Sequence, residues 1–244
     1  MNHKKIISLS MMLILAINFS FAQAVKEIEK AQKAGKSIYL IVTDKAAKGT
    51  DALINLAEDA SRSVKNTAIV RLDRDDKANA ALISKYRLAG ASLPIVLIVA
   101  SNGVATGGFN ANDATSENLI SFLPTKTQAE VLLAFETGKA AFIVCGKKNA
   151  KDKSELEAEC KKAITKIGNK AILVFIDVNN KKEENFLALL KPDLTKTTVF
   201  VFNGKGQYTG TLQSTAKSKD LIASVNKKVG GCCPGKSDKS GCGK

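Results

Sequence analysis

The five cysteines are the residues of this sequence best suited to chemistry. Three of them, Cys232, Cys233 and Cys242, lie near the C-terminus among Gly, Ser and Lys. Three thiolates suit a soft ion such as Cu(I) or Zn, and they could also exchange with other thiols. The alternative is a disulfide from Cys242 to one of the adjacent pair, because a bond between neighbours only ~3.8 Å apart at Cα would be strained. Both interpretations stay open: a metal-binding or thiol-exchanging tail, or a tail closed by a disulfide.

Histidine chemistry depends on how the N-terminus is processed. Lys4 and Lys5 precede an apolar, uncharged run from Ile6 to Phe21, and Ala22 offers a small residue at a cleavage point. This pattern predicts a signal peptide over residues 1–22 and therefore an exported protein, periplasmic or extracellular, with no later membrane span. Cleavage would remove His3, the only histidine, so the pattern argues against a His base or an imidazole metal ligand. We therefore expect no enzyme of those classes.

The stretch from residue 66 to residue 109 contains the clearest structural pattern. An apolar run ends at Asp73, an amphipathic segment covers 76–87, and Pro94 directly precedes a second apolar run over 95–100. Asn102-Gly103 then leads into a third extended run over 104–109. This order predicts strand, helix, strand, hairpin turn and strand. With helices expected near 25–35, 51–64 and 116–122 and a strand over 38–42, it indicates an α/β domain with a mixed sheet.

The second half of the chain repeats the first at an offset near 103 residues. Residues 34–42 return at 137–144, the run ending at Asp73 returns at Asp177, and Asn102-Gly103 falls opposite Lys205-Gly206. A repeat this long indicates a duplicated domain, because solenoid units are shorter. We predict domains over 23–124 and 125–229, followed by a flexible tail over 230–244 that is rich in Cys, Gly and Lys.

The order of these elements resembles the thioredoxin fold, and the resemblance covers about residues 25–123. It rests on the strands at 36–40 and 70–73, on Lys85-Tyr86-Arg87-Leu88, on Ser92-Leu93-Pro94 and on Asn102-Gly103. The chain is therefore expected to hold two tandem thioredoxin-like domains, each a central mixed sheet flanked by helices. The resemblance implies a cis bond before Pro94, beside the family's active site. Thr197 or Thr198 occupies the matching position in the second half.

The departures from that family bear most on function. Ala47 and Thr50 align with the two reactive cysteines, Ile41 replaces the buried acid, and the loop at 146–152 of the second domain also lacks the pair. Cys145 and Cys160 could be a nucleophile and its resolving partner. We favour a structural interpretation, as buried apolar residues or one disulfide, since neither stands at the helix start that lowers a thiol pKa.

These observations leave two classes of function. The first is a redox-inactive binding or scaffold module with polypeptide or acidic partners, and the second is a thiol or soft-metal protein that uses its tail. The net charge of +14 becomes +12 without the two lysines of the signal segment, which favours attraction to acidic partners. No nucleic-acid motif is present in the sequence, so we expect no nucleic-acid partner.

Overall fold

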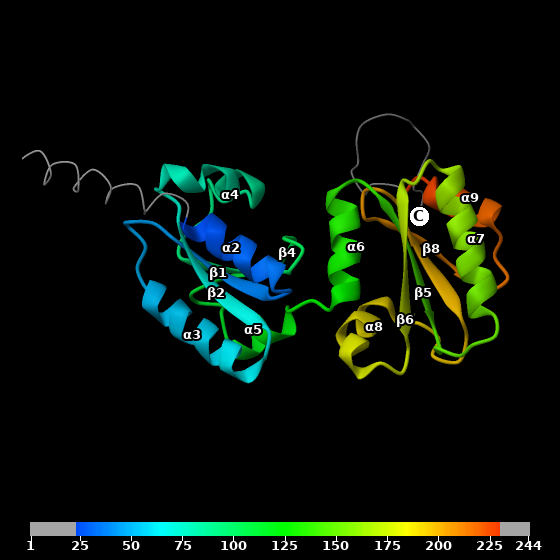
Figure 1. Ribbon diagram of the computed structural model, residues 1–244, viewed down its shortest axis with the longest axis horizontal. Coiled ribbons are helices and arrows are strands. Elements are labelled where there is room, and N and C mark those ends of the chain that lie inside the picture. The colour runs from blue at the N-terminus through cyan, green and yellow to red at the C-terminus, as the bar shows by residue number, and fades with distance from the viewer. Residues whose placement is uncertain (1–22, 230–244) are drawn as a thin grey trace, which may run out of the picture. The chain divides into compact units, whose positions relative to one another are not determined.

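The computed structural model describes residues 23–229, so the predicted signal segment 1–22 and tail 230–244 lie outside the described residues. Two compact units are formed, and each holds one four-stranded sheet (Figure 1). The first contains the described residues up to Glu136 together with Lys182–Leu189, and the second contains Thr137–Lys181 and the described residues from Leu190 onward. Between residues 23 and 229, no helix is both long and apolar enough to cross a membrane.

The first sheet has the strand order β2-β1-β3-β4. Its strands are β1 (Ser37–Thr43), β2 (Thr67–Asp73), β3 (Ile95–Val99) and β4 (Ala105–Asn110). β1 pairs with β2 in parallel, whereas the β1–β3 and β3–β4 pairs are antiparallel. The apolar run of β1 is buried along five consecutive residues, as expected for a central strand covered on both faces.

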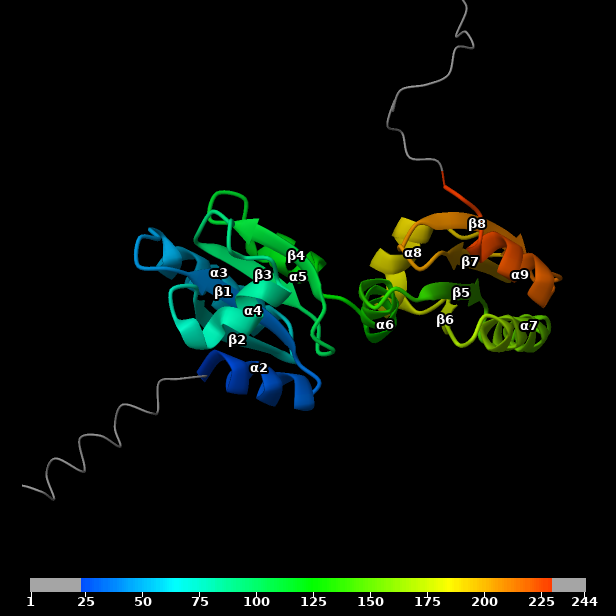
Figure 2. The same cartoon turned by 90° about the horizontal axis from the view of Figure 1, so that it is seen from above.

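Helices cover both faces of this sheet (Figure 2). They are α2 (Gln23–Lys33), α3 (Thr50–Ser63), α4 (Ala80–Lys85), which follows a 3-10 turn at Lys77–Asn79, and α5 (Ser116–Ser121). α2 and α4 pack on the face that carries Ile38, Leu40 and Val42. α3 and α5 pack on the opposite face, which carries Tyr39 and Ile41, because successive side chains of a strand alternate between faces.

Two glycines end elements where the chain must adopt a left-handed conformation. Gly35 has a φ of +68° after α2, and Lys36 donates its N–H to the Ala31 carbonyl at 2.9 Å. Gly103 has a φ of +88° in the β3–β4 turn and donates its N–H to the Ala100 carbonyl at 2.8 Å. A side chain other than glycine rarely adopts this conformation, so the sequence marks both turns.

The second half repeats the element order of the first. The helices are α6 (Lys126–Glu136), α7 (Lys153–Lys166), α8 (Glu184–Leu190) and α9 (Ser218–Val225), with a 3-10 turn at Lys181–Glu183. The strands are β5 (Ala140–Gly146), β6 (Ala171–Asp177), β7 (Thr198–Phe202) and β8 (Tyr208–Gln213), in the order β6-β5-β7-β8. α7 and α9 share one face of this sheet with Phe142, Val144 and Val199.

The repeat is regular at the level of single residues. β1 and β5 begin at Ser37 and Ala140, and β3 and β7 begin at Ile95 and Thr198, in both cases 103 residues apart. Both hairpins have an irregular register at equivalent points, Ile98/Val99 and Val201/Phe202. This correspondence confirms the predicted pair of mixed sheets flanked by helices. The domain boundary predicted at residues 124 and 125 falls within the first compact unit and stays a prediction.

Candidate functional site

The candidate site lies where β1 and β2 end and β3 begins, in the first unit. Because parallel strands finish at the same edge of a sheet, the segments that follow them meet there. Asp44 follows β1, Arg74 follows β2, and the loop from Leu88 to Pro94 leads into β3. The Leu93–Pro94 peptide bond is cis and Pro94 is buried.

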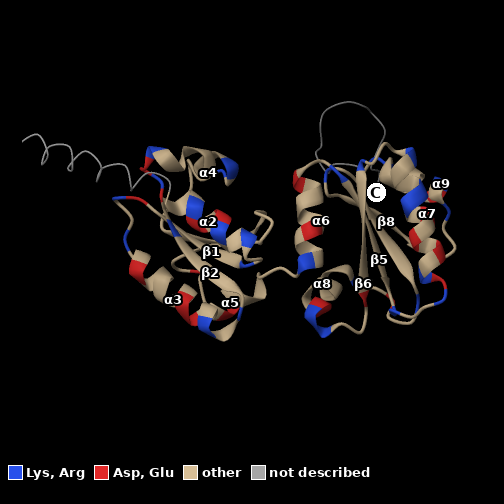
Figure 3. Cartoon of the chain, in the orientation of Figure 1, with Lys and Arg blue, Asp and Glu red and all other residues tan. Residues whose placement is uncertain are grey.

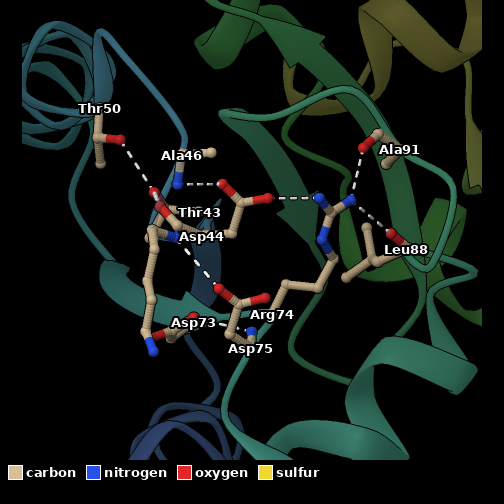
Figure 4. Close-up of polar contacts among 10 residues, drawn as sticks. Thr43, Asp44, Ala46, Thr50, Asp73, Arg74, Asp75, Leu88 and Ala91 are labelled. Carbon is tan, nitrogen blue, oxygen red and sulfur yellow. Dashed lines mark hydrogen bonds and ion pairs between the residues drawn. The ribbon is translucent and has the colours of Figure 1, made fainter.

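An ion pair joins these three segments (Figure 4). The Arg74 guanidinium donates to the Asp44 carboxylate through one nitrogen and to the Ala91 carbonyl, at 2.7 Å, through another. That second nitrogen also lies 3.4 Å from the Leu88 carbonyl oxygen. The side chains of Arg74 and Asp44 are only 24% and 13% exposed, so the pair is shielded from solvent. Charge-assisted bonds in such surroundings are stronger than those between neutral groups.

Backbone and hydroxyl contacts fix the loop between β1 and α3. Ala46 donates its N–H to Asp44 at 3.0 Å, and Lys45 donates its N–H to Asp75 at 3.3 Å. The hydroxyls of Thr43 and Thr50 are 3.0 Å apart across the two ends of the loop. The loop is therefore held at both ends and along its first residues by polar groups of this unit.

This loop contains the positions that the family resemblance predicts for the reactive cysteine pair. Ala47 contributes a methyl group, and the Thr50 hydroxyl lies against Thr43 at the first turn of α3. Ile41, aligned with the family's buried acid, is fully buried in the core beside α3. These side chains supply no thiolate and no proton-transfer group for disulfide exchange.

The equivalent region of the second unit is arranged differently. Register places Ile95 opposite Val42 and Thr198 opposite Cys145, so Thr197 is the counterpart of Pro94. The buried Thr197 donates its hydroxyl to Asp152 at 2.7 Å, beside the start of α7. Hydrogen bonds from Thr197 and Ser214 lower the pKa of the Asp152 carboxyl. These residues line a cavity of about 280 Å³ that also includes Lys147 and Lys196.

Cys145 and Cys160 are both fully buried, and they lie on different faces of the second sheet. Cys160 on α7 packs with Phe142 and Val144, whereas Cys145 follows Val144 on β5 and so points to the opposite face. The two form no disulfide. Burial raises the pKa of the Cys160 thiol to about 12. Cys232, Cys233 and Cys242 lie outside the described residues.

Sequence reasoning did not single out Asp44, Arg74 or Asp152. Asp44 is one of several charged residues in a polar loop, and Arg74 lies within a run of five charged residues from Asp73 to Lys77. Nothing in their spacing shows that they meet, since thirty residues separate the partners. The useful signal would have been position: both directly follow strands that are parallel neighbours.

The topology of each sheet supports the family resemblance. Both sheets have a parallel pair, then an antiparallel strand, then a hairpin to the edge, as the sequence order predicted. The chain has a tandem thioredoxin-like fold.

Solved structures similar to this chain share little of its sequence. No protein-family model and no curated protein matches the chain. Several solved structures do, among them the first two thioredoxin domains of Naumovozyma dairenensis Eps1p, at 10% identity and a TM-score of 0.31, covering 82% of this chain and 95% of that one. The NTD_N/C domain of alkylhydroperoxide reductase AhpF from Enterococcus faecalis matches at 12% identity and a TM-score of 0.29. The match covers 82% of this chain and 96% of that one. Human ERp44 form II matches at 10% identity and a TM-score of 0.37. The match covers 82% of this chain and 54% of that one.

Proposed function

We propose that this protein is an exported, redox-inactive tandem thioredoxin-like protein that acts as a binding or scaffold module, periplasmic or extracellular. The observation that carries the proposal is the Asp44–Arg74 pair, which fixes the loop at the aligned reactive position where Ala47 and Thr50 replace cysteines. A loop held in this way keeps its backbone in one conformation, which reduces the entropy lost when a partner binds.

The ligand proposed for this site is an extended polypeptide that contacts the loop before Pro94. Ser92 is exposed and Leu93 is half-buried, so the loop offers both backbone groups and an apolar contact. A suitable probe is reduced, carboxymethylated α-lactalbumin, an unfolded chain without reactive thiols. Its titration into isotope-labelled protein should shift the amide signals of residues 91–93 and of the loop at 44–49.

Substitutions in the loop test this assignment. Leu93→Asp should weaken binding of the unfolded chain by about tenfold, because it places a charge in an apolar contact. Ser121→Asp, on an exposed position of α5, serves as the control and should bind as the unchanged protein does. Equal affinity for both variants, or amide shifts confined to other surfaces, would contradict the proposal that the unfolded chain contacts the loop before Pro94.

The charge distribution supports acidic partners at the second half. Residues 125–229 hold 19 lysines against 11 acidic residues, which gives +8, whereas residues 23–124 hold 13 basic against 11 acidic residues, which gives +2. Figure 3 shows lysines on α7 and on the loops at both ends of the second sheet. A partner attracted in this way should bind more weakly as salt rises. Unchanged binding of a poly-glutamate probe between low and high salt would contradict this.

The cysteine-rich tail supports the alternative function, a thiol-exchanging or soft-metal protein. The observation that favours it is the set of three cysteines within 232–242. Titration of the reduced protein with Zn²⁺ or Cu(I), beside a variant that ends at Val229, tests it. Metal uptake that requires the tail would support the alternative, and equal uptake by both proteins would exclude it.

A further inference from the structure

Along the outer edge of β2, some backbone groups have no partner in the part of the chain that the structure describes. β2 is the first strand in the sheet order, so β1 is its only neighbour among the described strands. Arg74 donates its N–H to the Thr43 carbonyl and Asn66 accepts from the Ser37 N–H, so the even-numbered residues of this segment face β1. Because backbone groups alternate along a strand, the N–H and C=O groups of Ile69 and Arg71 point outward. Within residues 23–229 these outward groups have no hydrogen-bond partner.

Side chains contact both ends of this free edge, and at one end a side chain occupies a backbone carbonyl. The Asp73 carbonyl accepts a hydrogen bond from the Asn79 amide at 2.8 Å, and Asn79 is buried. At the other end, the Thr67 hydroxyl lies 2.8 Å from that of Ser61 on α3. The available edge is therefore a short, defined segment that could pair with a few residues of another strand.

Two cavities lie along this edge, between β2 and its flanking helices. A cavity of about 220 Å³ is bounded by α2 and β2, with Ala31, Ala34 and Ala68 among its lining residues. A cavity of about 640 Å³ reaches α3 and includes Ile54 and Arg71. Both include Glu27 and Ile69, so they are neighbouring parts of one depression. Cavities beside a free strand edge can take the side chains of an added strand.

The larger cavity is acidic although the protein as a whole is basic. Four carboxylates line it, against the single guanidinium of Arg71: Glu27, Glu58, Asp73 and Asp76. None of the four forms a salt bridge within the described part of the chain. Asp73 and Asp76 accept only local backbone N–H groups, from Asp75 and Ala78. A basic side chain of a ligand would complement this charge.

We propose that the outer edge of β2 binds an extended polypeptide segment of a partner protein, in which apolar and basic residues alternate. The segment would add a strand to the sheet by pairing with the N–H and C=O groups of Ile69 and Arg71. An apolar side chain would enter the smaller cavity, and a Lys or Arg side chain would enter the acidic one. This surface is built from β2, α2 and α3, and it does not depend on the loop before Pro94.

Titration of isotope-labelled protein with the peptide acetyl-Val-Lys-Val-Lys-Val-Lys-Val-amide tests the proposal. The amides of Ile69 and Arg71 should shift and become protected from hydrogen exchange. A peptide with N-methyl groups at alternate residues should bind about three- to tenfold more weakly, because it lacks the donors that pair with β2. A peptide with Glu in place of Lys should also bind more weakly. Equal binding of all three peptides would overturn the proposal.

Protein variants localise the contact. Arg71→Pro removes an outward N–H and leaves the β1–β2 ladder complete, so it should bind the Val-Lys peptide more weakly than Arg71→Ala, which loses the same charge and keeps the N–H. Glu58→Lys keeps the backbone and should weaken binding of the peptide about two- to fivefold. Glu117→Lys on α5 makes the same charge change outside both cavities and should have no effect.

Two other results would also overturn the proposal. Peptide-induced shifts at residues 91–93 rather than at β2 would assign the peptide to the loop before Pro94. Concentration-dependent dimerisation of the protein alone, with protection of the Ile69 and Arg71 amides, would make a second copy of this chain the occupant.

Discussion

Arg74 donates a charge-assisted hydrogen bond to Asp44, and this contact joins the end of β2 to the loop that leads into α3. The same guanidinium also donates to the Ala91 carbonyl, three residues before Pro94. One side chain thus holds together the three segments that surround the aligned reactive position. The pair gives that region a structural role and supplies no group that could carry out disulfide exchange.

Removal of Arg74 should destabilise the first unit. Arg74→Ala leaves a largely buried Asp44 carboxylate and the Ala91 carbonyl without their donor, so we expect a loss of about 2–3 kcal/mol in the free energy of unfolding. Urea denaturation of the unchanged protein and the variant measures this. Arg62→Ala, which breaks an exposed pair with Asp59, should cost less than about 1 kcal/mol. Similar losses for the two variants would contradict the assigned role of Arg74.

Gly146 should be required for the Thr197–Asp152 contact in the second unit. A Cβ at position 146 would lie 2.9 Å from the Thr197 hydroxyl oxygen and 3.1 Å from its methyl carbon. We expect Gly146→Ala to cost about 1–3 kcal/mol by overpacking, with part of the loss recovered in Gly146→Ala/Thr197→Ala. Gly90→Ala, where the added Cβ meets nothing within 4 Å, is the control and should be near neutral. Strictly additive losses in thermal unfolding would argue against the clash.

The sheets were predictable from sequence because their patterns are local. Five consecutive apolar residues in β1 require burial on both faces, and glycine at position 103 marks a turn with positive φ. The predicted helix over 76–87 is shorter in the structure, since a 3-10 turn occupies Lys77–Asn79 before α4. Asp76 explains this start, because its side chain accepts the Ala78 N–H and caps the turn.

The sequence predicted where the candidate site lies, but it did not predict the polar contacts that form it. The placement of Ala47 and Thr50 at the reactive positions follows from the family resemblance alone and stays a prediction. The Asp44–Arg74 pair depends on two loops meeting in space, and no local pattern reports such a contact. A disulfide between Cys145 and Cys160 was one of the interpretations from sequence, and it is wrong. Cys160 on α7 packs against one face of the second sheet, whereas strand alternation points Cys145 of β5 to the other face.

Among residues 23–229 the buried hydroxyl of Tyr39 has no hydrogen-bond partner, so removal of this hydroxyl should stabilise the protein. Burial raises the pKa of Tyr39 to about 12. Tyr39→Phe should raise the free energy of unfolding at neutral pH by about 1 kcal/mol, because it removes an unsatisfied buried group. Tyr86→Phe is the control: its hydroxyl donates to the Gly103 carbonyl at 3.2 Å, and its loss should destabilise by a similar amount.

The same residue gives a pH dependence with a defined sign. Since the pKa of Tyr39 is higher in the folded state, the unfolded chain releases its proton first, from about pH 10. Ionisation of Tyr39 thus leaves the free energy of unfolding unchanged below about pH 10 and lowers it as pH rises toward 12. Tyr39→Phe should show a shallower decline over that interval in urea denaturation. A steeper or identical decline would show that Tyr39 does not titrate with folding.

The two buried cysteines should resist alkylation in the native protein. In a variant that ends at Val229, iodoacetamide at pH 8 should label neither Cys145 nor Cys160 within the time that labels both in urea, because both side chains are fully buried. Intact mass distinguishes the products. Rapid labelling of Cys145 in the native state would reveal an accessible thiol and reopen the assignment of a nucleophile.

The central claim is that neither thioredoxin-like unit exchanges disulfides, and insulin reduction by dithiothreitol tests it most directly. The variant that ends at Val229 should accelerate the reaction no more than the same variant carrying Cys145→Ala and Cys160→Ala. Ala47→Cys/Thr50→Cys in the same background, with a cysteine pair at the aligned positions, provides the positive comparison. A rate for the variant ending at Val229 that exceeds its cysteine-free counterpart would contradict the claim.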